Sequence, residues 1–328
     1  MIQPNSALAV TGWRFGTDFA IRLFYQGPDD LIRYSAYDTV FANWSAPRVL
    51  SVKASSNTSL STSIIWWEPD VVDLNPYPQM QLFFRGTSGK IEGQNWRDGG
   101  PATGFSDSIV NASFTPAADS RLATYWPSTL YQDDDGSVQE IFFNLTNGGY
   151  QTATSLSVSG TAAGPLIALP LTPSHNGREL RVLYRRTDGK MYEFNRNSGG
   201  TTASSSGAMP FSVPDEAGVG AFATANSDDT LTTYLLWQDT SNNGTVQIVW
   251  QDGSSDGWKG PVTDSVFDGA DNPTQLACVT AGSSGGAAVV PLQAKDDMNR
   301  CYFQVGGALK EVWYNGSKWV DMGFVKMP

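Results

Sequence analysis

Short apolar runs, separated by turns rich in glycine and aspartate, repeat along the whole chain. One segment type recurs six times, and its mostly apolar and aromatic residues are typical of a largely buried strand. The six segments span 22–26, 81–85, 128–132, 181–185, 234–238 and 300–304. A turn and a second strand-like run follow each of them, and these second runs begin at 31, 90, 137, 190, 245 and 308. The pattern therefore predicts six β-hairpins.

A strand of small apolar residues precedes each hairpin, as at 7–10, 121–124 and 275–278. Small side chains suit an innermost strand, because neighbouring sheets crowd around a common axis. A repeat of roughly fifty residues holds enough strands for a four-stranded antiparallel blade, and radial repetition of such blades closes a propeller. The predicted fold class is therefore all-β, a six-bladed β-propeller.

One repeat is too small to bury its own faces, so we expect residues 1–328 to form a single propeller domain. No linker or second domain is evident in the sequence. The expected blade repeats lie at approximately 7–45, 59–105, 120–150, 164–200, 217–260 and 275–320.

Composition and charge limit the partners. Hydrophobic residues make up 40% of the chain and charged residues 16%, which permits a sizeable core and disfavours disorder. The net charge of -11 argues against nucleic acid, whose phosphates are bound mainly through Lys and Arg, and disfavours anionic membrane surfaces. No apolar run approaches membrane-spanning length. The simplest meaning of the charge is an acidic surface that keeps the protein soluble.

Two features bear on the compartment and indicate the secretory pathway or the extracellular space. Six glycosylation sequons begin at Asn43, Asn57, Asn111, Asn144, Asn243 and Asn315. Cys278 and Cys301 both fall in strand-like segments of the last repeat, where a disulfide is possible if the strands are neighbours. Two buried free thiols are the alternative. The chain starts at Met1 without a signal peptide, so we expect that a leader has been removed.

The repeated pattern of Arg-x-aromatic-aromatic-Gln, a turn, Ile-x-Glu, then an aromatic residue and Trp resembles the fungal fucose-specific lectins. The resemblance covers essentially the whole chain, and six repeats in register carry it. It implies that each sugar site lies between two blades. Arg and Glu of one blade would bond the sugar hydroxyls, while Tyr and Trp of the next blade would cover the sugar's apolar patch. This chemistry is sound, since a charged fork fixes hydroxyl geometry and an aromatic face covers C–H groups.

Two of the six implied sites are largely retained. The site between blades six and one is complete, with Arg300, Glu311, Tyr37 and Trp44. The site between blades four and five keeps Arg181, Glu193 and Trp258, with Gln251 at the position of the Tyr. An inter-strand salt bridge is the alternative explanation for the Arg–Glu pairs, and packing between blades is the alternative for the tryptophans.

The other four sites have lost sugar anchors, so we expect fucose binding at no more than two sites. The first keeps Arg22 with Tyr34 at the Glu position, the second has Gln81 and Gly93, and the third has Ser128 with Glu140 and no aromatic cover. The fifth is aromatic and apolar, with Tyr234 and Ile248 facing Tyr314 and Trp319.

The eroded pattern, together with the marks of secretion, is also similar to the fungal hetero-Diels–Alderases of tropolone sesquiterpenoid biosynthesis, which share the lectin-like fold. This resemblance implies a cofactor-independent pericyclase that joins a tropolone quinone methide to a humulene-type alkene. Such a reaction needs positioning and polarisation of a carbonyl, without a catalytic triad or a metal. The sequence contains a single histidine and shows no metal or cofactor motif, so we expect neither.

The enzyme is our leading hypothesis from sequence, and a lectin with one or two working sites is the alternative. A multivalent lectin gains avidity from many sites and would have little reason to lose most of them. An aromatic, proline-rich insertion at 66–78 is also longer than a hairpin turn requires. The partners are therefore the two small substrates or fucosylated glycans, bound by a monomer or homodimer.

Two places could form the active pocket of such an enzyme. The first is the fifth inter-blade site, in which Tyr234 or Tyr314 would donate to the tropolone oxygen, Trp319 would stack on its ring, and Ile248 would line the wall. The alternative is the mouth of the axial tunnel, with Trp13, Trp67, Tyr77, Trp126 and His175.

Overall fold

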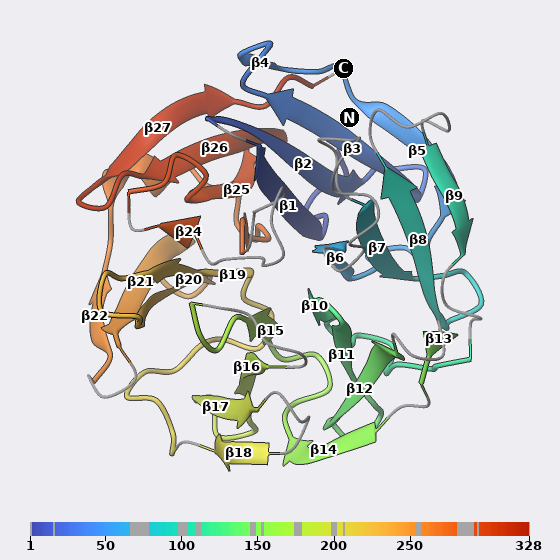
Figure 1. Cartoon of the computed structure of the whole chain (residues 1–328), viewed down its shortest axis with the longest axis vertical. Helices are drawn as coiled ribbons and strands as arrows, with labels where there is room; N and C mark the ends of the chain where they lie inside the picture. The colour runs from blue at the N-terminus through green and yellow to red at the C-terminus, as the bar shows by residue number, and fades with distance from the viewer. Residues whose placement is uncertain are drawn as a thin grey trace.

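Six sheets built on antiparallel strands surround a central axis, which confirms the six-bladed β-propeller (Figure 1). The computed structural model describes residues 2–15, 17–65, 79–97, 104–108, 113–144, 149–151, 154–173, 179–197, 202–205, 207–253, 257–280, 292–293 and 295–327. Over these ranges, no helix has the length and hydrophobicity needed to span a membrane.

The first three blades each follow the chain from the innermost strand outward. Blade one contains β1 (Leu8–Phe15), β2 (Asp18–Gln26), β3 (Leu31–Asp38), β4 (Asn43–Trp44) and β5 (Arg48–Lys53). Blade two contains β6 (Leu60–Ile65), β7 (Gln79–Arg85), β8 (Ile91–Arg97) and β9 (Gly104–Ser108). Blade three contains β10 (Ala123–Tyr125), β11 (Ser128–Gln132), β12 (Ser137–Asn144), β13 (Gly149–Tyr150) and β14 (Thr154–Ser159).

The last three blades repeat this order, with one crossover. Blade four contains β15 (Leu166–Leu169), β16 (Leu180–Arg185), β17 (Met191–Arg196) and β18 (Thr202–Ser205). Blade five contains β19 (Val219–Ala225), β20 (Leu231–Asp239), β21 (Thr245–Asp252) and β22 (Lys259–Val262), and the 3-10 turn η2 (Ser265–Phe267) follows it. Blade six contains β23 (Ala277–Cys278), β25 (Arg300–Val305), β26 (Ala308–Tyr314) and β27 (Trp319–Phe324). The short β24 (Leu292–Gln293) leaves blade six and pairs in parallel with β19 of blade five.

The register between the second and third strands is the same in all six blades, so the site positions compared along the sequence are equivalent in space. Two residues after the Arg position, the second strand pairs with the Glu position of the third. These pairs are Phe24–Tyr34, Phe83–Gly93, Leu130–Glu140, Leu183–Glu193, Leu236–Ile248 and Tyr302–Glu311.

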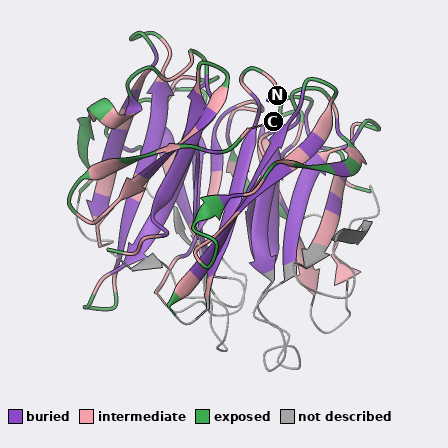
Figure 2. Cartoon of the chain, turned by 90° about the horizontal axis from the view of Figure 1, so that it is seen from above, coloured by how far each residue is buried: buried purple, intermediate pink, exposed green. Residues whose placement is uncertain are grey.

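The hydrophobic core lies between neighbouring blades. One cluster joins Trp13 and Phe24 of blade one to Leu82 and Phe84 of blade two, and each of the other five interfaces has its own cluster. The inner strands of the blades are largely buried, whereas outermost strands such as β5 and β22 are mostly exposed, as are many of the turns (Figure 2). Because each blade is covered by its two neighbours, the ring buries apolar surface that one repeat alone would leave in water.

The last residue of each repeated segment joins its blade to the next. Gln26 donates to the carbonyl of Ser55 at 2.8 Å, and Gln304 closes the ring by donating to the carbonyl of Gln3 at 3.0 Å. Gln132 and Gln238 make the corresponding bonds, and Arg85 and Arg185 replace glutamine in blades two and four. These amide and guanidinium groups, most of them buried, thus satisfy loop carbonyls that no strand pairs with.

The predicted disulfide is confirmed. Cys278 on β23 and Cys301 on β25 lie directly opposite one another in the sheet register and are bonded. The bond ties the innermost strand of blade six to its neighbour.

Candidate functional site

The interface between blades six and one brings together all four residues of the complete predicted site. Arg300 on β25 donates through Nη1 to Oε1 of Glu311 on β26, at 2.7 Å. Trp44, on β4 of blade one, donates its indole N–H to the other carboxylate oxygen, Oε2, at 3.0 Å. The Arg300 guanidinium lies 5.0 Å from the ring centroid of Tyr37, whose ring lies 5.5 Å from that of Trp44. The carboxylate is therefore held by donors from both blades.

Two further side chains complete this site and were not predicted from the sequence. Tyr302 donates its hydroxyl to Oε1 of Glu311 at 2.9 Å, and burial raises the pKa of Tyr302 well above its usual value, so the phenol stays protonated. Phe19 covers the Arg300 guanidinium at 4.9 Å. Tyr302 occupies an aromatic position of the repeated segment, to which the sequence analysis gave no role in the site.

The site retains a donor for a ligand. Arg300 donates through Nε to the carbonyl of Asp297 at 2.7 Å and through Nη1 to Glu311. Its Nη2 makes no hydrogen bond within the described part of the chain. Arg300 and Glu311 are only 5% and 3% exposed, so they are pre-ordered by their neighbours rather than by solvent. The charged Nη2 donor of Arg300 and a partly exposed Tyr37 ring are thus fixed before any ligand arrives.

The interface between blades four and five also brings an Arg–Glu pair together, with different partners. Arg181 Nε lies 3.3 Å from Glu193 Oε1, and Arg181 Nη1 donates to the Thr233 hydroxyl of blade five at 2.8 Å. Asn195 donates to the same Glu193 oxygen at 2.7 Å. Trp258 packs edge-on against Phe211, with ring centroids 5.6 Å apart. Hydrogen-bonding groups of both Arg181 and Glu193 are therefore already used within the protein.

At the interface between blades three and four the arginine comes from the neighbouring blade. Glu140 is fully buried, accepts from the Ser128 hydroxyl at 2.6 Å, and forms an ion pair with Arg196 on β17 of blade four. Arg196 stands three residues after Glu193, the place that Tyr37 holds relative to Tyr34 in blade one. The repeated pattern places the arginine and the glutamate in one blade and therefore did not predict this partner.

Two further interfaces use their polar residues internally. Arg22 donates to the carbonyl of Tyr37 at 3.0 Å, pairs with Asp38 at 3.2 Å, and lies 4.9 Å from the Trp13 ring. Gln81 accepts from the hydroxyl of Tyr150 in blade three at 3.0 Å.

The interface between blades five and six holds the aromatic residues predicted for an apolar pocket. Tyr234 stacks on Phe222 with ring centroids 4.7 Å apart, and it lies 5.0 Å from Tyr314. Trp319 lies 5.2 Å from Tyr314, and Ile248 is buried in the same cluster. Burial, and then a hydrogen bond to the Tyr314 hydroxyl, raise the pKa of Tyr234, so the phenol of Tyr234 stays protonated.

The residues predicted for the tunnel mouth are placed only in part. Trp13 is fully buried beside Arg22, and Trp126 is buried against Phe143, with ring centroids 5.4 Å apart. Neither is among the residues that line the axial cavity. Trp67, Tyr77, His175 and the insertion at 66–78 lie outside the described residues.

The sequons differ in exposure. Asn43, Asn57 and Asn243 are exposed, and Asn144 and Asn315 are partly buried. Asn111 lies outside the described residues. Within the ranges that the structure covers, no group of His, Cys, Asp and Glu side chains is arranged to hold a metal ion.

Comparison with known proteins places the fold. No protein-family model matches the chain, and no curated protein matches its sequence. Among solved structures, it is similar to the fungal lectin from Aleuria aurantia, a six-bladed β-propeller, with 17% identity, a TM-score of 0.73, and coverage of 99% of this chain and 96% of that one. It is also similar to AofleA from Arthrobotrys oligospora, with 16% identity, a TM-score of 0.67, and coverage of 98% and 87%.

A third similar structure is the SapL1 lectin in complex with alpha methyl fucoside, with 15% identity, a TM-score of 0.67, and coverage of 97% and 96%. At these identities the likeness concerns the fold. The chain therefore shares the six-bladed scaffold of fungal fucose-specific lectins.

Proposed function

We propose that this protein is a fucoside-binding lectin with one principal site, between blades six and one. The observation that carries the proposal is the arrangement around the Glu311 carboxylate. Arg300 and Trp44 both donate to it, and the Tyr37 ring lies beside the Arg300 guanidinium. A ligand hydroxyl would accept from Nη2 of Arg300, and the sugar's C–H face would lie against the aromatic side chains. Charge-assisted donors fix the hydroxyl geometry, while the rings exclude water from the apolar face.

The other interfaces support a low valency. Glu140 pairs with Arg196, Arg22 pairs with Asp38, and the interface between blades five and six has Tyr234 and Ile248 at the Arg and Glu positions. The first two arrangements already satisfy the groups that a sugar would need to engage, and the third lacks those groups. A protein with one principal site lacks the avidity of a multivalent ring, so its affinity for a cell surface would equal that of the single site.

Titration calorimetry with α-methyl-L-fucoside tests this function. We expect about one equivalent per chain, and we expect Arg300→Ala to weaken binding by roughly 10- to 150-fold, the worth of a hydrogen bond to a charged group. The matched control is Arg181→Ala, which removes the equivalent arginine of the interface between blades four and five and should leave this binding unchanged. More than two equivalents, or normal binding by the Arg300 variant, would contradict the proposal.

A second candidate function is the cofactor-independent hetero-Diels–Alderase. It is favoured by the aromatic interface between blades five and six, where the rings of Tyr234 and Tyr314 lie 5.0 Å apart and Trp319 packs against Tyr314. Tyr234 or Tyr314 would donate to the tropolone oxygen, which draws electron density from the quinone methide and makes it a better partner for the alkene. Catalysis would consist of positioning and polarisation.

Incubation with a tropolone quinone-methide precursor and a humulene-type alkene tests this activity by product formation. We expect Tyr234→Phe and Tyr314→Phe to lower the rate, and Arg300→Ala, at the sugar site, to leave it unchanged. An uncatalysed product ratio with the parent protein would exclude the enzyme, and equal rates for parent and tyrosine variants would exclude this interface as its site.

A further inference from the structure

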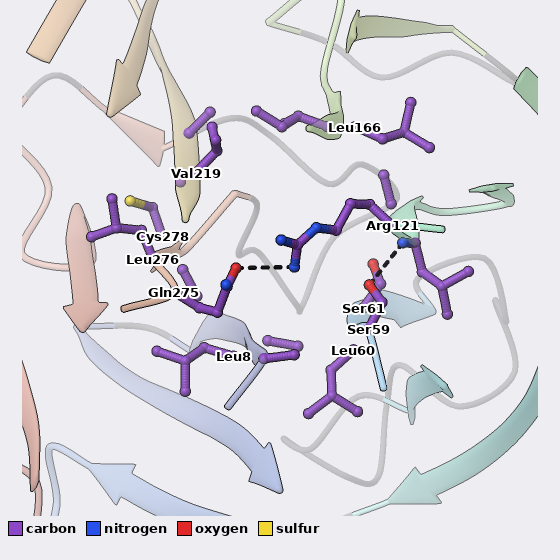
Figure 3. A pocket seen from close by; sticks show the side chains of 18 of the residues that line it. Leu8, Ser59, Leu60, Ser61, Arg121, Leu166, Val219, Gln275, Leu276 and Cys278 are labelled. Carbon is purple, nitrogen blue, oxygen red and sulfur yellow. Dashed lines mark hydrogen bonds between the residues drawn. The ribbon is translucent and has the colours of Figure 1, made fainter. Parts of the chain in front are cut away.

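The axial cavity holds one charged side chain in otherwise neutral surroundings. The cavity has a volume of about 130 Å³ and is lined by the inner strands of all six blades (Figure 3). Most of its lining is small or aliphatic, and each blade contributes a larger apolar side chain: Leu8, Leu60, Leu122, Leu166, Val219 and Leu276. Among the described residues that line it, Arg121 alone carries a charge.

Arg121 and Gln275 reach into the cavity from opposite sides of the ring and meet there (Figure 3). Arg121 stands just before β10 of blade three, and its Nη1 donates to Oε1 of Gln275, just before β23 of blade six, at 3.0 Å (Figure 3). Blades three and six are opposite in a ring of six. Gln275 is held in turn, because its Nε2 donates to Asn5 at 2.9 Å. Ala7 and Pro165 occupy the corresponding position in two other blades, so the arginine is peculiar to blade three.

The guanidinium lacks a carboxylate partner. Within the part of the chain that the structure describes, Arg121 forms no ion pair, and its Nε and Nη2 make no hydrogen bond. Burial lowers the pKa of Arg121, and the more distant charges of Asp119 and Glu216 offset this in part. Buried charges in proteins are normally paired, because an unpaired charge loses its hydration without compensation. An anion that enters the cavity would supply the missing partner.

We propose that the axial cavity binds a short-chain monocarboxylate, with its carboxylate on Arg121 and its hydrocarbon chain between the leucine side chains. A guanidinium presents two parallel N–H donors that match a carboxylate. Ser59 of blade two also lines the cavity. The Ser59 Oγ accepts a hydrogen bond from the backbone N–H of Leu122 at 2.8 Å, which leaves the hydroxyl proton of Ser59 for the ligand (Figure 3).

The class of ligand follows from the charge of Arg121 and from the aliphatic lining of the cavity. A single guanidinium neutralises one negative charge, which favours a monoanion over a phosphate or a dicarboxylate. The aliphatic lining favours a hydrocarbon chain over a polyhydroxylated one, because burial of apolar surface drives binding. This site is separate from the sugar site, since Arg300 and Glu311 do not line the cavity.

Calorimetry and thermal unfolding with hexanoate test the proposal, with hexan-1-ol as the neutral ligand of equal chain length. We expect hexanoate to bind the parent protein at least tenfold more tightly than hexan-1-ol and to raise its Tm, since a ligand that binds only the folded state stabilises it. Arg121→Met should reduce hexanoate affinity at least tenfold and leave fucoside binding unchanged. The matched control is Arg33→Met, which removes an arginine that pairs with Asp29 outside the cavity.

The outcomes separate the possibilities. Equal binding of hexanoate and hexan-1-ol by the parent protein would overturn the proposal without the use of any variant. Undiminished hexanoate binding by Arg121→Met would overturn it as well. Arg121→Lys, which keeps the charge and loses the fork, should retain part of the affinity. If the parent protein binds hexanoate but no fucoside, the lectin proposal is refuted and the proposal of a carboxylate site is supported.

Discussion

The ion pair between blades three and four allows a sharp test of how the interfaces are stabilised. Arg196→Met would leave Glu140, which is fully buried, with its charge uncompensated by the guanidinium. Removal of one member of a buried pair costs about 3–5 kcal/mol of folding free energy. The Ser128 hydroxyl, at 2.6 Å, still donates to the carboxylate, so the loss should lie at the lower end of this range. We expect a decrease of about 3 kcal/mol.

Urea denaturation followed by tryptophan fluorescence measures this loss. The matched control is the double variant Glu140→Met with Arg196→Met, which replaces both charges by apolar groups and should recover most of the stability. Ser128→Ala, which removes one hydrogen bond to the carboxylate, should cost roughly 1.5–3 kcal/mol. A loss below about 1 kcal/mol for Arg196→Met, within the range of exposed pairs, would refute the reasoning. So would a double variant no more stable than the single one.

Three further predictions concern the disulfide, the aromatic interface and pH. The bond between Cys278 and Cys301 closes a loop with a sequence separation of 23, so replacing both by Ser should lower stability by about 3 kcal/mol, and a thiol assay on unreduced, denatured protein should find no free thiol. Trp319→Ala should cost about 3 kcal/mol, measured by urea denaturation, because Trp319 packs against Phe267 and Tyr314 at 5.1 and 5.2 Å but is only partly buried. Normal stability would show that this packing is dispensable. Burial raises the pKa of Tyr234, so above pH about 10 this phenol is deprotonated in the unfolded chain and still protonated in the folded one. Tm should therefore fall as pH rises from about 9 to 11, and it should fall less steeply in Tyr234→Phe.

The residue pattern predicted the six-bladed fold and the equivalence of the six sites, and it placed both cysteines in strands of one repeat, where a disulfide or two buried thiols were possible. Each of these depends on relations within one hairpin or between adjacent strands, which recur in the sequence at a constant spacing. The Arg300–Glu311 pair illustrates this, because its two residues lie on paired strands of one hairpin. A local pattern repeated six times predicts local geometry well.

Contacts between blades were decided by the tertiary structure. Packing of blade four against blade three brings Arg196 to Glu140, whose own blade has Ser128 at the Arg position. Arg121 and Gln275 are 154 positions apart and meet only because a closed ring sets blade three opposite blade six. The sequence determines which side chains each blade carries. Which of them become partners depends on how the blades pack around the axis, because chain spacing does not encode contacts across that ring.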